Sequence, residues 1–264
     1  MTLKYHPILS TFQAEREALQ KQIIATLQND KRIVAAWLFG SLGRGTADAL
    51  SDIDIWLVVA DTFIQDIVAH RQQFVAQIQD PAFFVEAPQN APQDGGYLMA
   101  YYDMPTGPHQ VDWYWQPQSL AYIPAEAIVL FDHIGLPHHE LPVTFPRRDA
   151  VKEITETPLH FISYFWAMLL INAKYIMRRP EGEELRLLPY ALHPFNKAQY
   201  ILDQEQAKID MPQTTYQEKL SVLRCLASEM CEIMPKIAAL GEAVPNEAPR
   251  VVCKYLDIIE EASA

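Results

Sequence analysis

The stretch that most constrains this chain is residues 38–59, LFGSLGRGTADALSDIDIWLVV. The run over residues 33–39 is rich in β-branched and aromatic side chains and too short for a stable helix, which predicts a buried strand. It leads into Gly40 and Ser41, with two further glycines close behind, and glycine lets a backbone approach a ligand closely. A strand that runs through such a turn into a helix start is a phosphate-binding geometry, because backbone N–H groups and the helix dipole face the anion.

Two carboxylates stand at the start of a second predicted buried strand, residues 53–59. They are Asp52 and Asp54, and residues two apart on a strand point to the same face. The two negatively charged carboxylates repel each other unless a cation lies between them. Mg²⁺ together with phosphate oxygens is the usual cation for a site of this kind.

The combination resembles the signature of the polymerase-β-type nucleotidyltransferases: Gly40-Ser41, ten residues, then Asp52-Ile53-Asp54 between apolar flanks. The sequence GSxGRG…SDIDIWLVV is most similar to the motifs of the small bacterial branch of that superfamily. This branch includes the aminoglycoside and lincosamide nucleotidyltransferases and the minimal nucleotidyltransferases of toxin–antitoxin pairs. The motif covers under a tenth of the chain. Taken alone, the glycine turn could be a plain turn. Taken alone, the Asp52–Asp54 pair could be a solvated strand end or a helix cap.

A third carboxylate stands in the middle of an aromatic-rich strand predicted over residues 109–116, HQVDWYWQ. Alternation places Asp112 on the face opposite the tryptophans, where an isolated charge is costly unless it is paired or bound to a metal. The resemblance implies a third acidic residue on a later strand of the same sheet, and Asp112 matches that role in order and context. The alternatives are an Asp on the solvent face of a hairpin, and Asp103 as the third acid, although Asp103 abuts the turn.

A change of composition after residue 141 divides the chain. Residues 1–141 are predicted to form an α/β (α+β) nucleotidyltransferase domain with a mixed sheet, and residues 142–264 an all-helical C-terminal bundle. Beyond the motif, strands are expected over 82–86, 96–103, 109–116 and 127–132, and helices over 10–30, 61–79, 158–179, 194–208, 215–240 and 249–261. Asp61 or Thr62 is the expected N-cap of the second of these helices.

The net charge of −12 and the sequence pI of about 5.1 disfavour a nucleic-acid partner, because binding to nucleic acid depends on neutralising phosphates. No apolar run is long and charge-free enough to span a membrane, and the first residues lack the apolar core of a signal peptide. Three cysteines without a CxxC pair predict a reduced, cytoplasmic protein. Cys225 and Cys231 fall in a helical pattern and are expected in the core. The sequence leaves open whether the chain forms a homodimer.

The resemblance implies nucleotidyl transfer, in which a hydroxyl attacks the α-phosphorus of a nucleoside triphosphate and pyrophosphate leaves. Asp52 and Asp54 would hold Mg²⁺ ions and the triphosphate, and Asp112 would bind the ion nearest the acceptor or act as a base. The expected function is transfer of a nucleoside monophosphate, AMP from ATP, to a hydroxyl of a small molecule, with an antibiotic and hence antibiotic resistance among the candidates. The alternative is a regulatory or antitoxin-type nucleotidyltransferase that modifies or binds a partner protein.

Further residues are candidates for phosphate binding. Gly40 and Ser41 would bind the β- and γ-phosphates, and Arg44 directly after the turn would neutralise phosphate charge, with a plain surface arginine as the alternative. Lys174 and Arg178 lie one turn apart on a predicted helix and therefore share a face. The resemblance implies that basic residues there reach the triphosphate, and helix-surface solubility is the alternative.

The segment around His133, His138 and His139 invites a zinc interpretation. However, it is a Gly/Pro loop without fixed ligand spacing, which argues against a metal site. The sequence identifies neither a role for this loop nor the acceptor nor the nucleotide.

Overall fold

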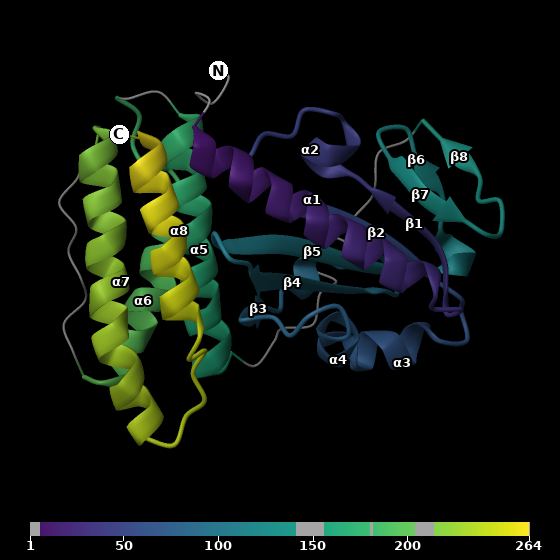
Figure 1. Cartoon of the computed structure of the whole chain (residues 1–264). Coiled ribbons are helices and arrows are strands. Elements are labelled where there is room, and N and C mark those ends of the chain that lie inside the picture. The colour runs from purple at the N-terminus through teal and green to yellow at the C-terminus, as the bar shows by residue number, and fades with distance from the viewer. Residues whose placement is uncertain (1–5, 141–155, 180–181, 204–213, 264) are drawn as a thin grey trace. The chain divides into compact units, whose positions relative to one another are not determined.

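The computed structural model of the chain describes residues 6–140, 156–179, 182–203 and 214–263 (Figure 1). It divides into two units. The sheet unit comprises residues 12–102 and 109–154, and the helical unit comprises residues 1–11, 103–108 and 155–264. The predicted boundary between 141 and 142 falls in residues 141–155, outside the described residues, and stays a prediction.

A six-stranded mixed sheet forms the centre of the sheet unit, in the order β3-β4-β5-β2-β1-β7. Strand β1 pairs antiparallel with both β2 and β7, whereas β2 and β5 are parallel. The predicted mixed sheet is therefore confirmed. The strands are β1 (Ile33–Leu38), β2 (Ile53–Val59), β3 (Phe83–Val85), β4 (Gly96–Asp103), β5 (Pro108–Pro117) and β7 (Ile128–Asp132).

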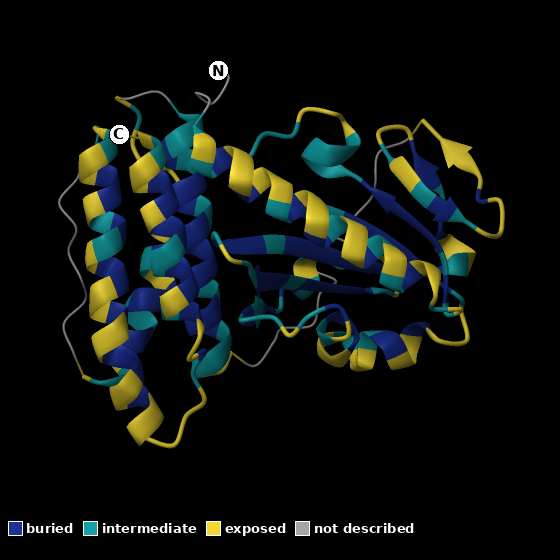
Figure 2. Cartoon of the chain, viewed as in Figure 1, coloured by how far each residue is buried: buried dark blue, intermediate teal, exposed yellow. Residues whose placement is uncertain are grey.

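Both faces of the sheet carry an apolar core. On one face, Trp113 and Trp115 of β5 lie in a cluster with the buried side of α1 (Pro7–Gln28), whose other side is exposed (Figure 2). On the opposite face, Tyr114 stacks on Trp56 with ring centroids 5.1 Å apart. The alternation predicted for β5 is confirmed, and it puts the even-numbered residues of this strand on the face where the carboxylates lie.

The helix predicted over residues 61–79 is wrong in detail, because two short helices occupy this segment. They are α3 (Ile64–Ala69) and α4 (Arg71–Ala76), separated at His70 with φ −112° and ψ 27°. Asp61 does not cap the first of them. Its carboxylate instead accepts hydrogen bonds from the backbone N–H and the hydroxyl of Ser119, at 3.0 and 3.1 Å. A partner so distant in sequence cannot be read from the local pattern.

The described part of the helical unit consists mainly of four long helices, which confirms the predicted helical region. Thr157 caps the first by accepting a hydrogen bond from the N–H of His160, and Thr215 and Glu218 form a capping box on the third. Within the described residues, no helix has the length and apolar character needed to cross a membrane. The helices are α5 (Pro158–Arg178), α6 (Leu188–Ile201), α7 (Tyr216–Ala239) and α8 (Ala248–Ser263).

The prediction that Cys225 and Cys231 lie in the core is wrong, since both are exposed and free. The buried stripe of α7 runs through Leu223, Ala227 and Met230, in steps of three or four. The two cysteines fall between these steps and therefore face away from the packed side of the helix.

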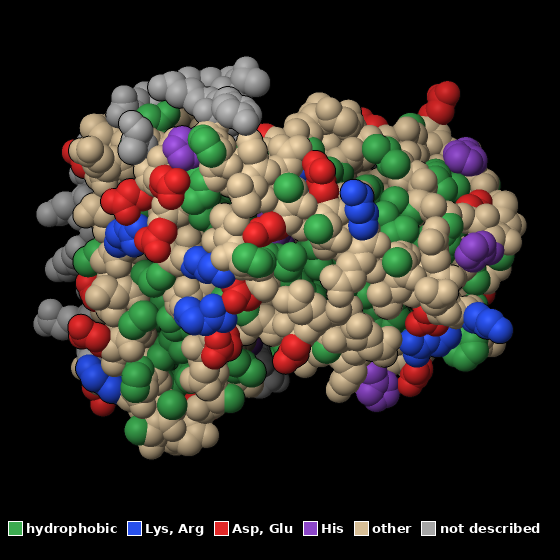
Figure 3. All heavy atoms as spheres, viewed as in Figure 1, with side chains coloured by type: hydrophobic (Ala, Val, Ile, Leu, Met, Phe, Trp, Pro, Cys, Tyr) green, Lys and Arg blue, Asp and Glu red, His purple; other side chains and the backbone are tan. Residues whose placement is uncertain are grey.

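The surface of the molecule mixes charges of both signs. On the face drawn in Figure 3, Lys and Arg side chains are interspersed with Asp and Glu. Arg224 of α7, for example, lies 2.7 Å from Asp257 and 2.5 Å from Glu260 of α8. Such exposed pairs add little stability, but they prevent a continuous basic patch at this place.

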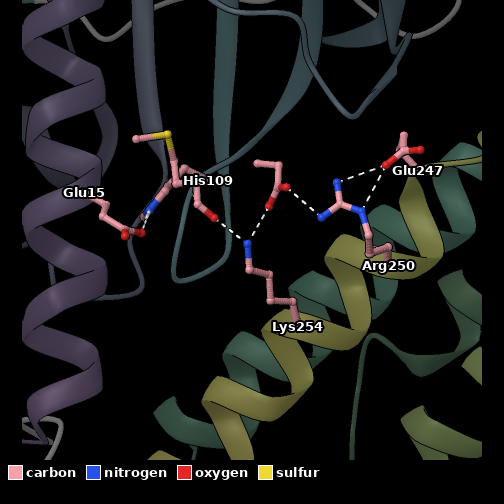
Figure 4. A network of polar contacts seen from close by, with 7 residues as sticks. Glu15, His109, Glu247, Arg250 and Lys254 are labelled. Atoms are coloured by element: carbon pink, nitrogen blue, oxygen red, sulfur yellow. Dashed lines mark hydrogen bonds and ion pairs between the residues drawn. The ribbon is translucent and has the colours of Figure 1, made fainter.

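Burial of His109 makes the stability of the fold depend on pH. Its ring stacks on Phe12 with centroids 4.0 Å apart, and burial together with the charge of Arg16 lowers the pKa of His109 to about 3. The imidazole is therefore neutral at neutral pH. Its Nε2 atom lies 3.7 Å from a carboxylate oxygen of Glu15 (Figure 4). At neutral pH this contact is not an ion pair, because the imidazole carries no charge.

We expect the free energy of unfolding to fall as the pH drops below about 6.5, the usual pKa of histidine. The unfolded chain binds a proton there while the folded chain does not, so the loss approaches about 1.4 kcal/mol per pH unit. Urea denaturation at pH 7 and pH 5 measures it. His109→Phe should remove most of the difference, and an unchanged difference in that variant would assign the pH dependence to other groups.

Candidate active site

The glycine turn lies directly against one of the predicted carboxylates. Strand β1 leads into α2 (Gly40–Gly43), a single helical turn whose first residue has φ +62°. A Cβ atom at Gly40 would lie only 2.0 Å from Oδ2 of Asp54. The N–H of Phe39 also donates to the carbonyl of Asp54 at 3.2 Å. Turn and carboxylate can approach this closely only because residue 40 has no side chain.

Asp54 and Asp112 are paired residues on the parallel strands β2 and β5. Paired residues of adjacent strands point to the same face of a sheet, so the two carboxylates are neighbours. Asp112 is buried and Asp54 is half-buried. Tyr114 shares their face, and its pKa is raised by burial and by the negative charges of Asp112, Asp54 and Asp52. All three carboxylates therefore lie within electrostatic reach of one phenol.

The three carboxylates do not form a closed ligand set. Among the residues that the structure describes, no group of three or more His, Cys, Asp and Glu side chains is arranged to hold a metal ion. The structure thus brings Asp54 and Asp112 together and places Asp52 in electrostatic range of the same ring. Metal binding by this trio stays a prediction.

Two side chains that the sequence did not single out hold the Asp112 carboxylate. The Tyr97 hydroxyl donates to Oδ1 at 2.7 Å, and the Gln110 amide donates to Oδ2 at 2.9 Å. Gln110 could have been found, because it stands two residues before Asp112 on the same face of the predicted strand. Tyr97 could not, since its position beside Asp112 depends on how β4 and β5 are aligned.

A buried arginine of α1 holds the segment that leads into Asp52. The guanidinium of Arg16 donates to the carbonyl oxygens of Asp48 at 2.6 Å and of Ser51 at 3.1 Å. Arg16 is only 3% exposed. The sequence signal was an arginine on the apolar side of a predicted helix. Because Ser51 directly precedes Asp52, this contact fixes the backbone from which that carboxylate projects.

The turn residues predicted to bind phosphate have different surroundings. The Ser41 hydroxyl oxygen is buried and has no hydrogen-bond partner among the described residues. A buried hydroxyl left in this state is unfavourable, so it suits a ligand oxygen that would accept its proton. Arg44 has a side chain that is 48% exposed and lies 3.6 Å from Glu126. Its predicted role toward phosphate is not tested by this geometry.

Lys174 and Arg178 belong to α5 of the helical unit. Their four-residue spacing within one helix places them on a common face, as predicted. Lys174 is buried and Arg178 is half-buried. Their contact with a triphosphate stays a prediction.

Asp103, the competing candidate for the third carboxylate, has cationic partners instead. It belongs to the helical unit, where its carboxylate lies 2.8 Å from Arg250 and 2.9 Å from Lys254. Burial raises the pKa of Asp103, but hydrogen bonds from Lys254 and Arg250 outweigh it and lower the pKa overall. Two basic side chains thus neutralise this carboxylate, which favours Asp112 as the third acid.

The histidine loop is organised by a carboxylate. Asp132 accepts hydrogen bonds from the N–H groups of Ile134, Gly135 and Leu136, at 2.8 to 3.0 Å. Beyond it, β8 (His138–His139) pairs with β6 (Ile123–Pro124), and both histidines are exposed. The geometry of this loop is explained by hydrogen bonds to Asp132.

The fold thus places a glycine turn against one carboxylate and a second carboxylate on the parallel neighbouring strand. Residues 21–92 match the family model described as polymerase beta, nucleotidyltransferase. The chain therefore carries a nucleotidyltransferase domain of the polymerase-β type, which confirms the predicted superfamily and enzyme class. The matched residues include the turn, Asp52 and Asp54, while Asp112 lies beyond them.

No curated protein matches the sequence. Solved structures to which the chain shows similarity include CdnC of E. coli MS115-1 in complex with HORMA-deltaN, with 13% identity and a TM-score of 0.30, covering 81% of this chain and 63% of that one. The CdnE cyclic dinucleotide synthase of Elizabethkingia meningoseptica, with GTP and Apcpp, has 14% identity and a TM-score of 0.28, covering 94% and 89%. The STING-associated CdnE c-di-GMP synthase of Capnocytophaga granulosa has 12% identity and a TM-score of 0.30, covering 98% and 83%. The chain spans less than two thirds of the length of the first of these.

Proposed function

We propose that this protein transfers a nucleoside monophosphate, in the first instance AMP from ATP, to a hydroxyl group of a small molecule in a Mg²⁺-dependent reaction. The observation that carries the proposal is the pairing of Asp54 with Asp112 on parallel strands, beside the Gly40 turn. Two carboxylates held next to each other beside a glycine turn would hold a divalent cation, which would supply positive charge to a bound triphosphate.

We assign separate roles in metal binding, phosphate binding and acceptor orientation to the residues of the site. Asp54, Asp112 and Asp52 would hold Mg²⁺, which supplies positive charge to the attacking and departing oxygens. The Ser41 hydroxyl and the first N–H groups of α2, which have no partner within the helix, would donate to phosphate oxygens. Asp112 would orient the acceptor hydroxyl or accept its proton. Lys174 and Arg178 would contribute charge toward the triphosphate.

The overall charge bears on the acceptor. With a net charge of −12, the protein attracts cations over distances comparable to the Debye length. A cationic hydroxylated compound such as an aminoglycoside is therefore our first candidate acceptor, and antibiotic modification the corresponding role.

We expect one nucleoside triphosphate to raise the unfolding temperature in the presence of Mg²⁺. A ligand at about a hundred times its dissociation constant adds roughly 2.7 kcal/mol, which is a shift of several degrees for a chain of this size. Thermal unfolding with each of the four ribonucleoside triphosphates, with and without Mg²⁺, measures it. Magnesium alone and pyrophosphate alone are the controls. The absence of a shift with all four nucleotides would contradict the proposal.

The acceptor is then sought by pyrophosphate release with the stabilising nucleotide. The panel contains aminoglycosides, lincosamides, nucleosides and nucleotides. Release with a small hydroxylated compound supports the proposal. Nucleotide binding without turnover on any of them would favour the alternative, a nucleotidyltransferase that modifies or binds a partner protein.

A further inference from the structure

The Asp112 carboxylate is the centre of a buried hydrogen-bond network. Gln110, which donates to one of its oxygens, accepts in turn from the Tyr101 hydroxyl at 3.3 Å. Tyr97 donates to the other oxygen from the adjacent strand β4. Asp112 and Tyr97 are 6% and 3% exposed. The network therefore fixes both oxygens of the carboxylate away from bulk water.

The chemical nature of the two donors matters. A buried carboxylate needs hydrogen-bond donors, and an arginine or lysine in that position would cancel its charge, as happens at Asp103. A phenol and an amide are neutral, so they orient Asp112 without cancelling its charge. An ionised carboxylate has about four acceptor positions, and the Tyr97 and Gln110 hydrogen bonds use one on each oxygen.

We propose that Tyr97, supported by Gln110, is a positioning residue of the transfer reaction: it fixes the Asp112 carboxylate in the orientation that receives the metal ion. This inference rests on the proposed function, because it assumes that Asp112 is a metal ligand. Groups that orient a metal ligand typically contribute 10- to 100-fold to metal affinity or activity.

The strand that carries Tyr97 also provides a matched control. Tyr102 is buried on the opposite face of β4, and its hydroxyl donates to the carbonyl of Val75 at 3.2 Å. Tyr97→Phe and Tyr102→Phe each remove one buried hydroxyl from the same strand. Only the first removes a donor to Asp112.

The test measures Mn²⁺ binding by electron paramagnetic resonance, in the presence of a non-hydrolysable triphosphate, together with the Mg²⁺ dependence of turnover. We expect Tyr97→Phe to weaken Mn²⁺ binding by about 10- to 100-fold, with turnover partly recovered at high Mg²⁺. Tyr102→Phe should bind Mn²⁺ like the wild type, whatever its unfolding temperature. Gln110→Met removes the second donor and serves if Tyr97→Phe does not fold.

The outcomes separate this inference from the proposed function. A wild-type protein that binds neither Mn²⁺ nor a triphosphate would overturn both. A wild type that binds both, with Tyr97→Phe indistinguishable from Tyr102→Phe in Mn²⁺ affinity and Mg²⁺ dependence, would overturn the positioning role alone.

Discussion

Replacing Asp54 by Asn should reduce nucleotidyl transfer by on the order of 10³-fold, the size of effect seen when a preorganised electrostatic group is removed from an active site. Asn keeps the shape of the side chain but removes the charge that we assign to the cation. The backbone pairing of β2 with β5 does not involve the carboxylate, so the fold should persist. Pyrophosphate release at saturating nucleotide, with circular dichroism as the folding check, measures both parts.

The matched control is Asp103→Asn, the same exchange at the carboxylate that binds Arg250 and Lys254. We expect it to keep wild-type turnover and to lose some stability, because Arg250 and Lys254 each lose one charged partner. Equal losses of turnover in the two variants would show that the Asp54–Asp112 pair has no special part in the reaction.

Gly40→Ala is expected to have the second largest effect, on both stability and turnover. With φ at +62°, an alanine there carries a backbone penalty of about 1–2 kcal/mol. Its Cβ would also lie 2.0 Å from Oδ2 of Asp54, so the carboxylate must move. Misplacement of a reacting group by about 1 Å can cost on the order of 10²-fold in rate. Urea denaturation and turnover are the two measurements.

Gly45→Ala separates these two causes. Its φ is +69°, but nothing lies within 4 Å of the position that a Cβ would take. We therefore expect a similar loss of stability with little loss of turnover. If Gly45→Ala reduced turnover as strongly as Gly40→Ala, the contact with Asp54 would not be the cause.

Those parts of the site that depend on local pattern could be predicted from the sequence. The spacing from Gly40 to Asp54 lies within one strand–turn–strand unit, and the alternation of β5 fixes the face of Asp112. Each of these signals needs only neighbouring residues.

The supporting contacts could not be predicted, because they depend on which distant residues meet. Arg16 reaches the carbonyl of Ser51 from α1, and Tyr97 reaches Asp112 from the adjacent strand. The clearest error of this kind is the prediction of Asp61 as an N-cap. Its carboxylate accepts a hydrogen bond from Ser119 and does not cap the helix. Tertiary partners that satisfy a polar side chain override its local preference.

The parallel pairing of β2 with β5 has a consequence for how the protein matures. Strand β2 pairs antiparallel with β1, the strand that precedes it in the chain. This pairing therefore closes only a short loop. The pairing with β5 joins segments that are separated in the chain by α3, α4, β3 and β4, and contacts between distant segments form slowly. A chain that has folded only as far as β2 therefore holds the glycine turn and Asp54, but lacks Asp112 beside them. The carboxylate pair is therefore complete only once β2 has paired with β5, and a chain that lacks this pairing lacks the two adjacent carboxylates on which our proposal depends.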